Sequence, residues 1–164
     1  RIGSDAFVFI VNAENPVSDI TTDQARGIYS GRIRNWKELG GKDVPIAAIH
    51  RNEGSGSQTA LIKFMGDEQV VSDYTALFGS PIGISFRYYV TGMLGEGKVK
   101  ILSLNGIEPT PKTIKDGSYP VSGGVFAVYR KGEKNLNVYK AVDFMLSPDG
   151  QKIVEKSGYI PVHS

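Results

Sequence analysis

The chain has 164 residues, of which 40% are hydrophobic and 22% charged, as is usual for a globular protein with a packed core. Its 19 basic and 17 acidic residues leave a net charge of +2, which argues against a nucleic-acid-binding surface, so any preference for anions must come from a local site. Without cysteine and with two histidines, the chain has no disulfide framework and too few ligands for a metal site, so no metal or cofactor is expected.

The first predicted element is a strand at residues 6–12, where the continuous apolar run AFVFIVN is typical of a strand buried on both faces. A threonine cap and an early acid then predict a helix at residues 22–30, which Gly31 ends. Asn35 is expected to cap a short helical turn, and a second strand is predicted at residues 44–50.

A Gly/Ser-rich loop, RNEGSGS at residues 51–57, follows the second strand directly. Residues 57–65 then place apolar side chains on one stripe and predict a helix. The order is therefore strand, Gly-rich loop, helix.

The remaining elements are less regular. Strands are predicted at residues 82–85, 98–104 and 125–130, a helical turn at 112–115, an amphipathic helix at 135–146 with Leu136, Tyr139, Val142 and Phe144 or Met145 inward, and a last helix capped by residues 147–149. The turn-forming residues 116–120 and Gly123–Gly124 predict a hinge before the C-terminal segment.

Strands that alternate with helices predict an α/β fold with a mixed, mostly parallel sheet flanked by helices. In such folds ligands bind beyond the carboxyl ends of strands. The loop at residues 51–57 occupies such a position and is the candidate site.

The residue types in this loop favour binding of a tetrahedral oxyanion, phosphate first. A helix N-terminus carries backbone N–H groups without internal partners and about half a positive charge. Gly54 and Gly56 leave the backbone accessible, Ser55 and Ser57 add hydroxyl donors, and Arg51 can donate two parallel N–H bonds.

Two interpretations of this loop stay open. A GSGS segment is also typical of a flexible linker or a plain helix cap, although linkers seldom lie between a core strand and a patterned helix. Glu53 either orients Arg51 as its ion-pair partner or accepts the proton of a protonated phosphate, which would select against sulfate.

The sequence does not favour an enzyme. His50, Glu53 and Ser55 are the side-chain types of a hydrolase triad, but their closeness along the loop disfavours the required alignment, and His50 is expected to end a strand with its hydrogen bonds satisfied. Residues 92–98 match a phosphate-binding P-loop until Val99, which replaces the required Ser or Thr, so a surface turn is expected there.

Two stretches in particular, YSGRIRNWKELGG (29–41) and HRNEGSGSQT (50–59), resemble the phosphate-binding subunits of bacterial ABC-type phosphate transporters. Further similar stretches cover most of the chain. The resemblance implies a periplasmic-binding-protein-like fold of two lobes that close over phosphate. It identifies Arg51, Ser55, Gly56 and Ser57 as anion-contacting positions and Glu53 as the acidic neighbour, with Ser57 standing where many members carry Thr.

The resemblance also implies an organisation. Residues 1–122 correspond to the second, ligand-contacting lobe with its crossover strand, and residues 123–164 to a hinge strand and C-terminal helices that return to the first lobe. The N-terminal segment that builds most of the first lobe in the family is expected to be missing from this sequence.

The expected partners are inorganic phosphate and an ABC permease, and the expected location is extracytoplasmic, in the periplasm or at the cell surface, where a segment outside this sequence could carry a lipid anchor. The alternative function is a sensor, adhesion or assembly module that keeps the fold without transport.

Overall fold

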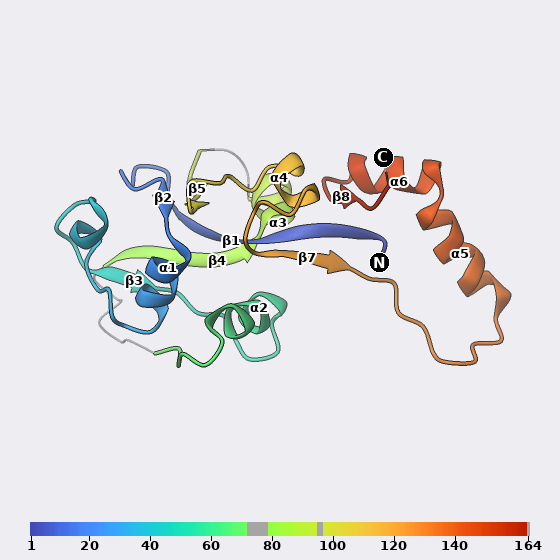
Figure 1. The fold of residues 1–164 in the computed structure, drawn as a ribbon, viewed down its shortest axis with the longest axis horizontal. Coiled ribbons are helices and arrows are strands. Elements are labelled where there is room, and N and C mark those ends of the chain that lie inside the picture. The colour runs from blue at the N-terminus through green and yellow to red at the C-terminus, as the bar shows by residue number, and fades with distance from the viewer. Residues whose placement is uncertain (72–78, 95–96, 164) are drawn as a thin grey trace.

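A computed structural model describes residues 1–71, 79–94 and 97–163 (Figure 1). The strands are β1 (Gly3–Asn12), β2 (Asp19–Ile20), β3 (Ile46–Ala48), β4 (Ser80–Phe86), β5 (Val99–Ile101), β6 (Ser103–Leu104), β7 (Ser122–Val125) and β8 (Ile160–Pro161). The helices are α1 (Thr22–Tyr29), the 3-10 helix η1 (Trp36–Leu39), α2 (Gly56–Met65), α3 (Arg87–Met93), α4 (Pro111–Lys115), α5 (Leu136–Leu146) and α6 (Pro148–Lys156).

The main sheet has six strands, with β1 next to β4, β5, β7 and β8 and with β3 on the far side of β4. The predicted α/β fold with a mixed sheet flanked by helices is confirmed. The expected parallel majority is not seen in the strand register, because β1 pairs antiparallel with all four neighbours and β3–β4 is the parallel pair. A strand that is apolar on both faces looks the same in either direction, so hydrophobicity alone could not decide this.

Strand β1 is the centre of the core, as its apolar run predicts. Its Phe7 and Phe9 rings meet edge to face at 5.2 Å, and both contact Phe64 of α2. Phe9 also packs against the fully buried Tyr29 of α1. These aromatic contacts hold α1 and α2 against the sheet.

The predicted starts of α1 and η1 are confirmed. Thr21 caps α1 by accepting a hydrogen bond from the Gln24 N–H, and the Gln24 side chain accepts from the Thr21 N–H in return. Asn35 and Glu38 form the same reciprocal pair at η1. Such capping boxes satisfy backbone donors that the helix itself leaves without partners.

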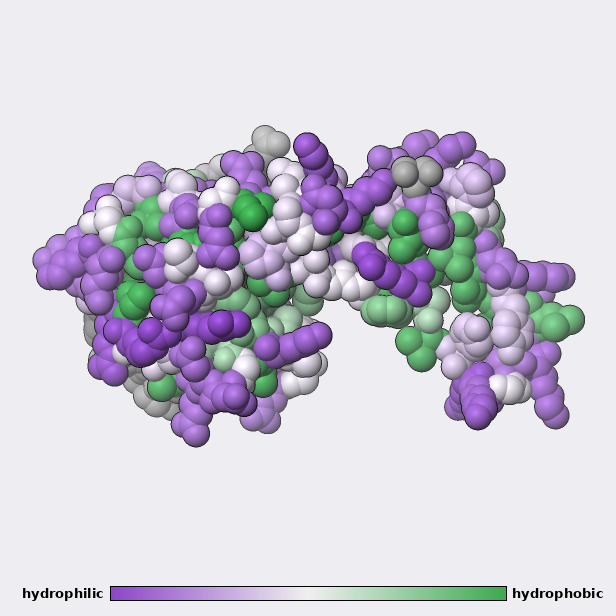
Figure 2. Space-filling model, in the orientation of Figure 1, coloured by the Kyte–Doolittle hydropathy of each residue, from purple (hydrophilic) through white to green (hydrophobic). Residues whose placement is uncertain are grey.

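The C-terminal segment stands apart from the main mass, and β1 joins the two (Figure 1). Helix α5 has no buried residue, and Leu136 and Phe144 are 69% and 53% exposed, so the prediction that its apolar stripe faces inward is wrong for this chain. In Figure 2 hydrophobic side chains lie on this segment beside the gap that separates it from the main mass.

The predicted strand at residues 125–130 is also wrong. The strand β7 ends at Val125, and Val128 is 90% exposed. Val125 pairs with Gly3, which is the first residue of β1. No further residues of β1 are left to pair with residues 126–130.

A second contact joins the C-terminal segment to α3. The Tyr88 and Tyr159 rings stack at 4.2 Å. Asp5 of β1 accepts a hydrogen bond from the Tyr88 N–H at 3.2 Å and so caps α3 from a neighbouring strand. Burial raises the pKa of Asp5, since desolvation disfavours the charged carboxylate, while its backbone hydrogen bonds and Arg87 oppose the shift.

Candidate functional site

The loop between β3 and α2 turns sharply before the helix. The Ser55 N–H donates to the Asn52 carbonyl at 3.1 Å, which closes a tight turn. Gly54 lies inside this turn with a φ of +83°, a conformation that side chains with a Cβ rarely adopt. Gly54 therefore serves the loop geometry as predicted, because the turn requires a positive φ at this position.

Helix α2 begins with Ser55 as its N-cap. The Ser55 Oγ accepts a long hydrogen bond, 3.4 Å, from the Gln58 N–H and lies 3.0 Å from the Ser57 Oγ. Within residues 1–71, 79–94 and 97–163, the Gly56 and Ser57 N–H groups have no acceptor, and the first turn contains no acid. Two backbone donors and two hydroxyls thus stand together at the positive end of a ten-residue helix.

The Arg51 side chain is exposed, and it forms no ion pair with any described residue. The expected ion pair with Glu53 is therefore not formed, and Glu53 is itself an exposed loop residue. Exposed pairs of long side chains gain little from contact, which explains why the closeness of these residues in sequence does not bring them together. The Arg51 backbone N–H instead donates to the Gln58 side-chain Oε1 at 3.0 Å.

A groove of about 670 Å³ begins at the start of α2. It is lined by Gly56 and Lys63 of α2, Arg26 of α1, Phe86 at the end of β4 and residues 122–124 of β7. A Cβ added to Gly56 would lie 3.7 Å from the Phe86 ring, an ordinary contact distance, so the fold does not require glycine here. The missing side chain instead keeps the Gly56 backbone open to the groove.

His50 differs from its prediction. Its Nε2 is buried and has no hydrogen-bond partner among the described residues, and its ring packs edge to face against Tyr29 at 5.8 Å. Strand β3 has already ended at Ala48, so His50 lies in the loop instead of at a paired strand end. No hydrogen bond joins His50 to Glu53 or Ser55, so the described loop does not assemble a hydrolase triad.

The described ranges show no sign of metal chemistry or of a membrane span. They contain no group of three or more His, Cys, Asp or Glu side chains that could hold a metal ion. No described helix has the length and apolar character needed to cross a membrane. Of the P-loop-like segment at 92–98, residues 92–93 end α3 and residues 95–96 lie outside the described part of the chain.

Sequence and structure comparisons point to one group of proteins. Residues 1–149 match the model of the PBP superfamily domain. The chain is 34% identical over 161 residues to the phosphate-binding protein PstS of Bacillus subtilis, covering 93% of this chain and 53% of that protein. It is 30% identical over 178 residues to PstS of Borreliella burgdorferi, covering 96% and 63%.

Among solved structures, the chain matches a putative phosphate ABC transporter substrate-binding protein from Clostridium perfringens with bound phosphate. The TM-score is 0.83 at 32% identity, and the match covers 98% of this chain and 70% of that one. The chain thus spans about half to two thirds of the length of the two PstS relatives.

Proposed function

The chain belongs to the PBP superfamily, and from that premise we propose that it is the anion-contacting part of a phosphate-binding protein that serves an ABC-type uptake system. It binds inorganic phosphate and releases it chemically unchanged. The observation that carries this proposal is the start of α2, where the Gly56 and Ser57 N–H groups have no acceptor among the described residues. The phosphate-binding names of the relatives support the same ligand.

The donors at the start of α2 suit a tetrahedral oxyanion. The two backbone N–H groups and the Ser55 and Ser57 hydroxyls can each donate to one of its oxygens, and the helix dipole favours its negative charge. The exposed Arg51 guanidinium supplies two further N–H donors in one plane. These charge-assisted bonds strengthen when water is excluded from the site.

We propose the division of the chain that its resemblance implies. Residues 1–122 form the ligand-contacting lobe, and residues 123–164 form the hinge strand and helices that belong with the first lobe. An apolar groove of about 360 Å³ supports this division, because its lining residues Ile2, Val125, Phe144 and Ile153 surround a surface that needs a cover. The cover in our proposal is the first lobe, which also completes the phosphate site from the opposite side.

The proposed partner is an ABC permease, and the proposed location is extracytoplasmic.

The test is the affinity of the full-length protein for phosphate, measured by isothermal titration calorimetry. Two charge-assisted hydrogen bonds are each worth about 1.5–3 kcal/mol, so Arg51→Ala should weaken phosphate binding at least about 100-fold without changing the melting temperature of the free protein. Arg32→Ala is the matched control, because it removes an exposed arginine held by Asp23 and Glu68 away from the loop. Equal affinity of wild type and Arg51→Ala would show that the site is wrongly placed.

Glu53→Gln separates the two proposed roles of Glu53. If the carboxylate accepts a proton from phosphate, the variant should lose selectivity against sulfate, because a neutral amide no longer repels a fully ionised oxyanion. If Glu53 instead orients Arg51 only once the anion is bound, since the two form no ion pair in the described chain, affinities for phosphate and sulfate should fall by the same factor. Competition between the two anions in the same calorimeter distinguishes these results.

A further inference from the structure

Gln58 lies in the first turn of α2, and its side chain reaches back along the chain instead of along the helix. It is 9% exposed, and its Oε1 accepts the Arg51 N–H at 3.0 Å, seven residues earlier. A buried side chain that holds one specific backbone group has little freedom to move. Gln58 is thus the described side chain that fixes the backbone of Arg51.

Gln24 in α1 shows what a glutamine at this helical position ordinarily does. Gln24 and Gln58 both occupy the third position of their helices, after a hydroxyl N-cap. The Gln24 side chain accepts the N–H of its own N-cap, Thr21, at 2.8 Å. The Gln58 side chain passes over its N-cap, Ser55, and ends at Arg51.

The turn before α2 explains the difference. The Ser55 N–H already donates to the Asn52 carbonyl, so the donor that a capping box would use is occupied. Gln58 therefore closes a ring from Arg51 to the first turn of α2. The segment that this ring closes, residues 51–58, carries the two serine hydroxyls and the Gly56 and Ser57 N–H groups.

We propose that Gln58 is a positioning residue for anion binding, which holds Arg51 over the start of α2 so that the guanidinium and the helix donors meet one ligand. This inference rests on the proposed function. Because the Arg51 N–H is taken by Gln58, Arg51 acts on the anion through its guanidinium. A neutral acceptor suits the task, since a carboxylate at this place would repel the anion as it held the loop.

Holding the loop in place before binding lowers the entropy that binding must otherwise remove. The loss of one neutral hydrogen bond corresponds to about a threefold to tenfold change in affinity. We expect Gln58→Leu to weaken phosphate binding by that factor, mainly through faster dissociation. Gln58→Glu should keep the loop in place and still weaken binding, with a loss that shrinks at high salt.

A double-mutant cycle in the full-length protein tests the inference, with Arg51→Lys as the second site because its weaker binding remains measurable. If Gln58 acts through Arg51, Gln58→Leu should cost less than twofold in the Arg51→Lys background. Gln24→Leu is the matched control: it removes the same type of bond at α1 and should leave the affinity for phosphate unchanged. Amide hydrogen exchange of Arg51 should rise in Gln58→Leu and not in Gln24→Leu.

The possible results separate the two proposals. Equal losses from Gln58→Leu in both backgrounds would overturn the positioning role and leave phosphate binding intact. The positioning role is also overturned if Arg51 loses its protection from exchange while affinity stays at the wild-type value. A wild-type protein that binds no phosphate would overturn the proposed function and this inference with it.

Discussion

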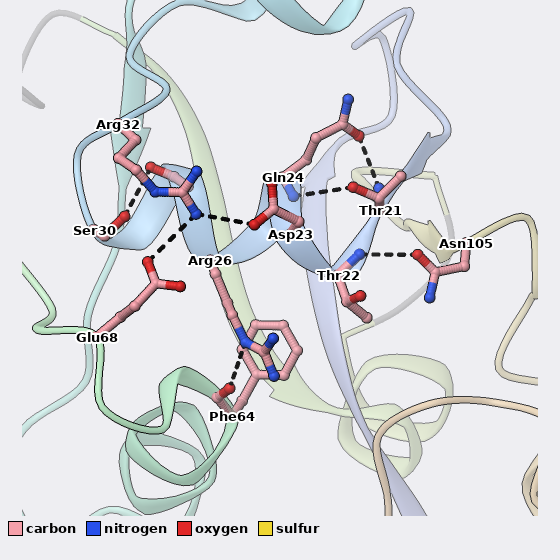
Figure 3. A network of polar contacts seen from close by, with 11 residues as sticks. Thr21, Thr22, Asp23, Gln24, Arg26, Ser30, Arg32, Phe64, Glu68 and Asn105 are labelled. Carbon is pink, nitrogen blue, oxygen red and sulfur yellow. Dashed lines mark hydrogen bonds and ion pairs between the residues drawn. The ribbon is translucent and has the colours of Figure 1, made fainter.

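Helices α1 and α2 both begin with a hydroxyl cap, but their first turns are completed in different ways. At α1, the Thr22 N–H donates to Asn105, the Gln24 N–H to Thr21, and Asp23 adds a negative charge (Figure 3). At α2 the Gln58 N–H likewise donates to its N-cap, Ser55, but Gly56, the counterpart of Thr22, has no acceptor in the described chain, and no acid is present.

The comparison shows that the fold can supply an acceptor for the first amide of a helix from elsewhere in the chain, as Asn105 does for Thr22. The open first amide of α2 therefore distinguishes its start from that of α1. It combines a glycine at the first position, a serine where α1 has Asp23, and a glutamine directed at Arg51. The difference agrees with the proposal that an external anion completes the start of α2.

The largest expected effect comes from giving α2 the acid that α1 has. Ser57 occupies the same helical position as Asp23, so Ser57→Asp should supply an internal anion and repel phosphate, with a loss of affinity of at least about 100-fold. The free protein should gain about 0.3–1 kcal/mol of stability from the helix dipole. Calorimetry and thermal unfolding measure the two effects.

Ser57→Asn controls for shape without charge. If the Ser57→Asp and Ser57→Asn variants bind phosphate with equal affinity, the absence of an acid is not what distinguishes the start of α2 from that of α1.

A smaller effect is expected for Gly56→Ala. The added Cβ fits against Phe86, so the fold should be retained or gain up to about 1 kcal/mol, as is common when alanine replaces glycine in a helix. The added methyl group should hinder the approach of phosphate to the Gly56 N–H. The loss of this hydrogen bond corresponds to about a tenfold loss of affinity. An unchanged affinity, measured with the melting temperature on the same sample, would show that the groove side of Gly56 is not where the anion approaches.

Thr21→Ala tests the closed helix start. Loss of an N-cap hydroxyl costs about 1 kcal/mol, so urea unfolding should show a destabilised protein, and phosphate affinity should not change. Thr21→Ser should restore the stability because serine caps equally well. A marked loss of affinity in Thr21→Ala would mean that the two helix starts are coupled.

The smallest effect is expected for Asp23→Asn. Asp23 interacts with the helix dipole and with the exposed Arg32, at 3.1 Å, and such a charge contributes about 0.3–1 kcal/mol. The difference in the free energy of unfolding should shrink in 1 M salt, where exposed charges are screened beyond about 3 Å. A difference that persists at high salt would point to a packing effect of Asp23 instead.

Local signals in the sequence predict much of the fold. They identify residues 6–12, the caps Thr21 and Asn35, and the helix after the Gly/Ser loop, because an apolar run or a capping side chain acts within a few residues of itself. For the same reason they place the loop at 51–57 between a strand and a helix, where the structure has it.

Long-range pairing could not be predicted. Residues 126–130 contain Phe126 and Val128, which are typical of a strand, but β1 supplies partners only as far as Val125. The sequence reveals the stripe of α5, yet a periodic pattern does not say what covers it. The two-residue strands β2 and β8 give no signal because each exists through a partner elsewhere in the chain.

The candidate site shows the same limit. Ser55 and Gln58 match the spacing of a capping box, which could have marked Gln58 in advance. That pattern would have directed the Gln58 side chain to Ser55, and the Asn52 turn that redirects it to Arg51 is a feature of three-dimensional structure. The Glu53–Arg51 pair is expected from closeness in sequence and does not form.

Strand β1 pairs with different strands along its length, and this bears on how the two masses of the chain can move. Residues Phe7–Val11 pair with β4, whereas Gly3–Ala6 pair with β7, so the strand passes from one mass to the other between Ala6 and Phe7. In the proposed two-lobe organisation, rotation of one mass against the other would be absorbed at this crossing and at the return near residues 121–122. Under the proposed function, substitutions at this crossing should change how readily the two masses move apart, whereas substitutions at the start of α2 should change the contacts made with the anion.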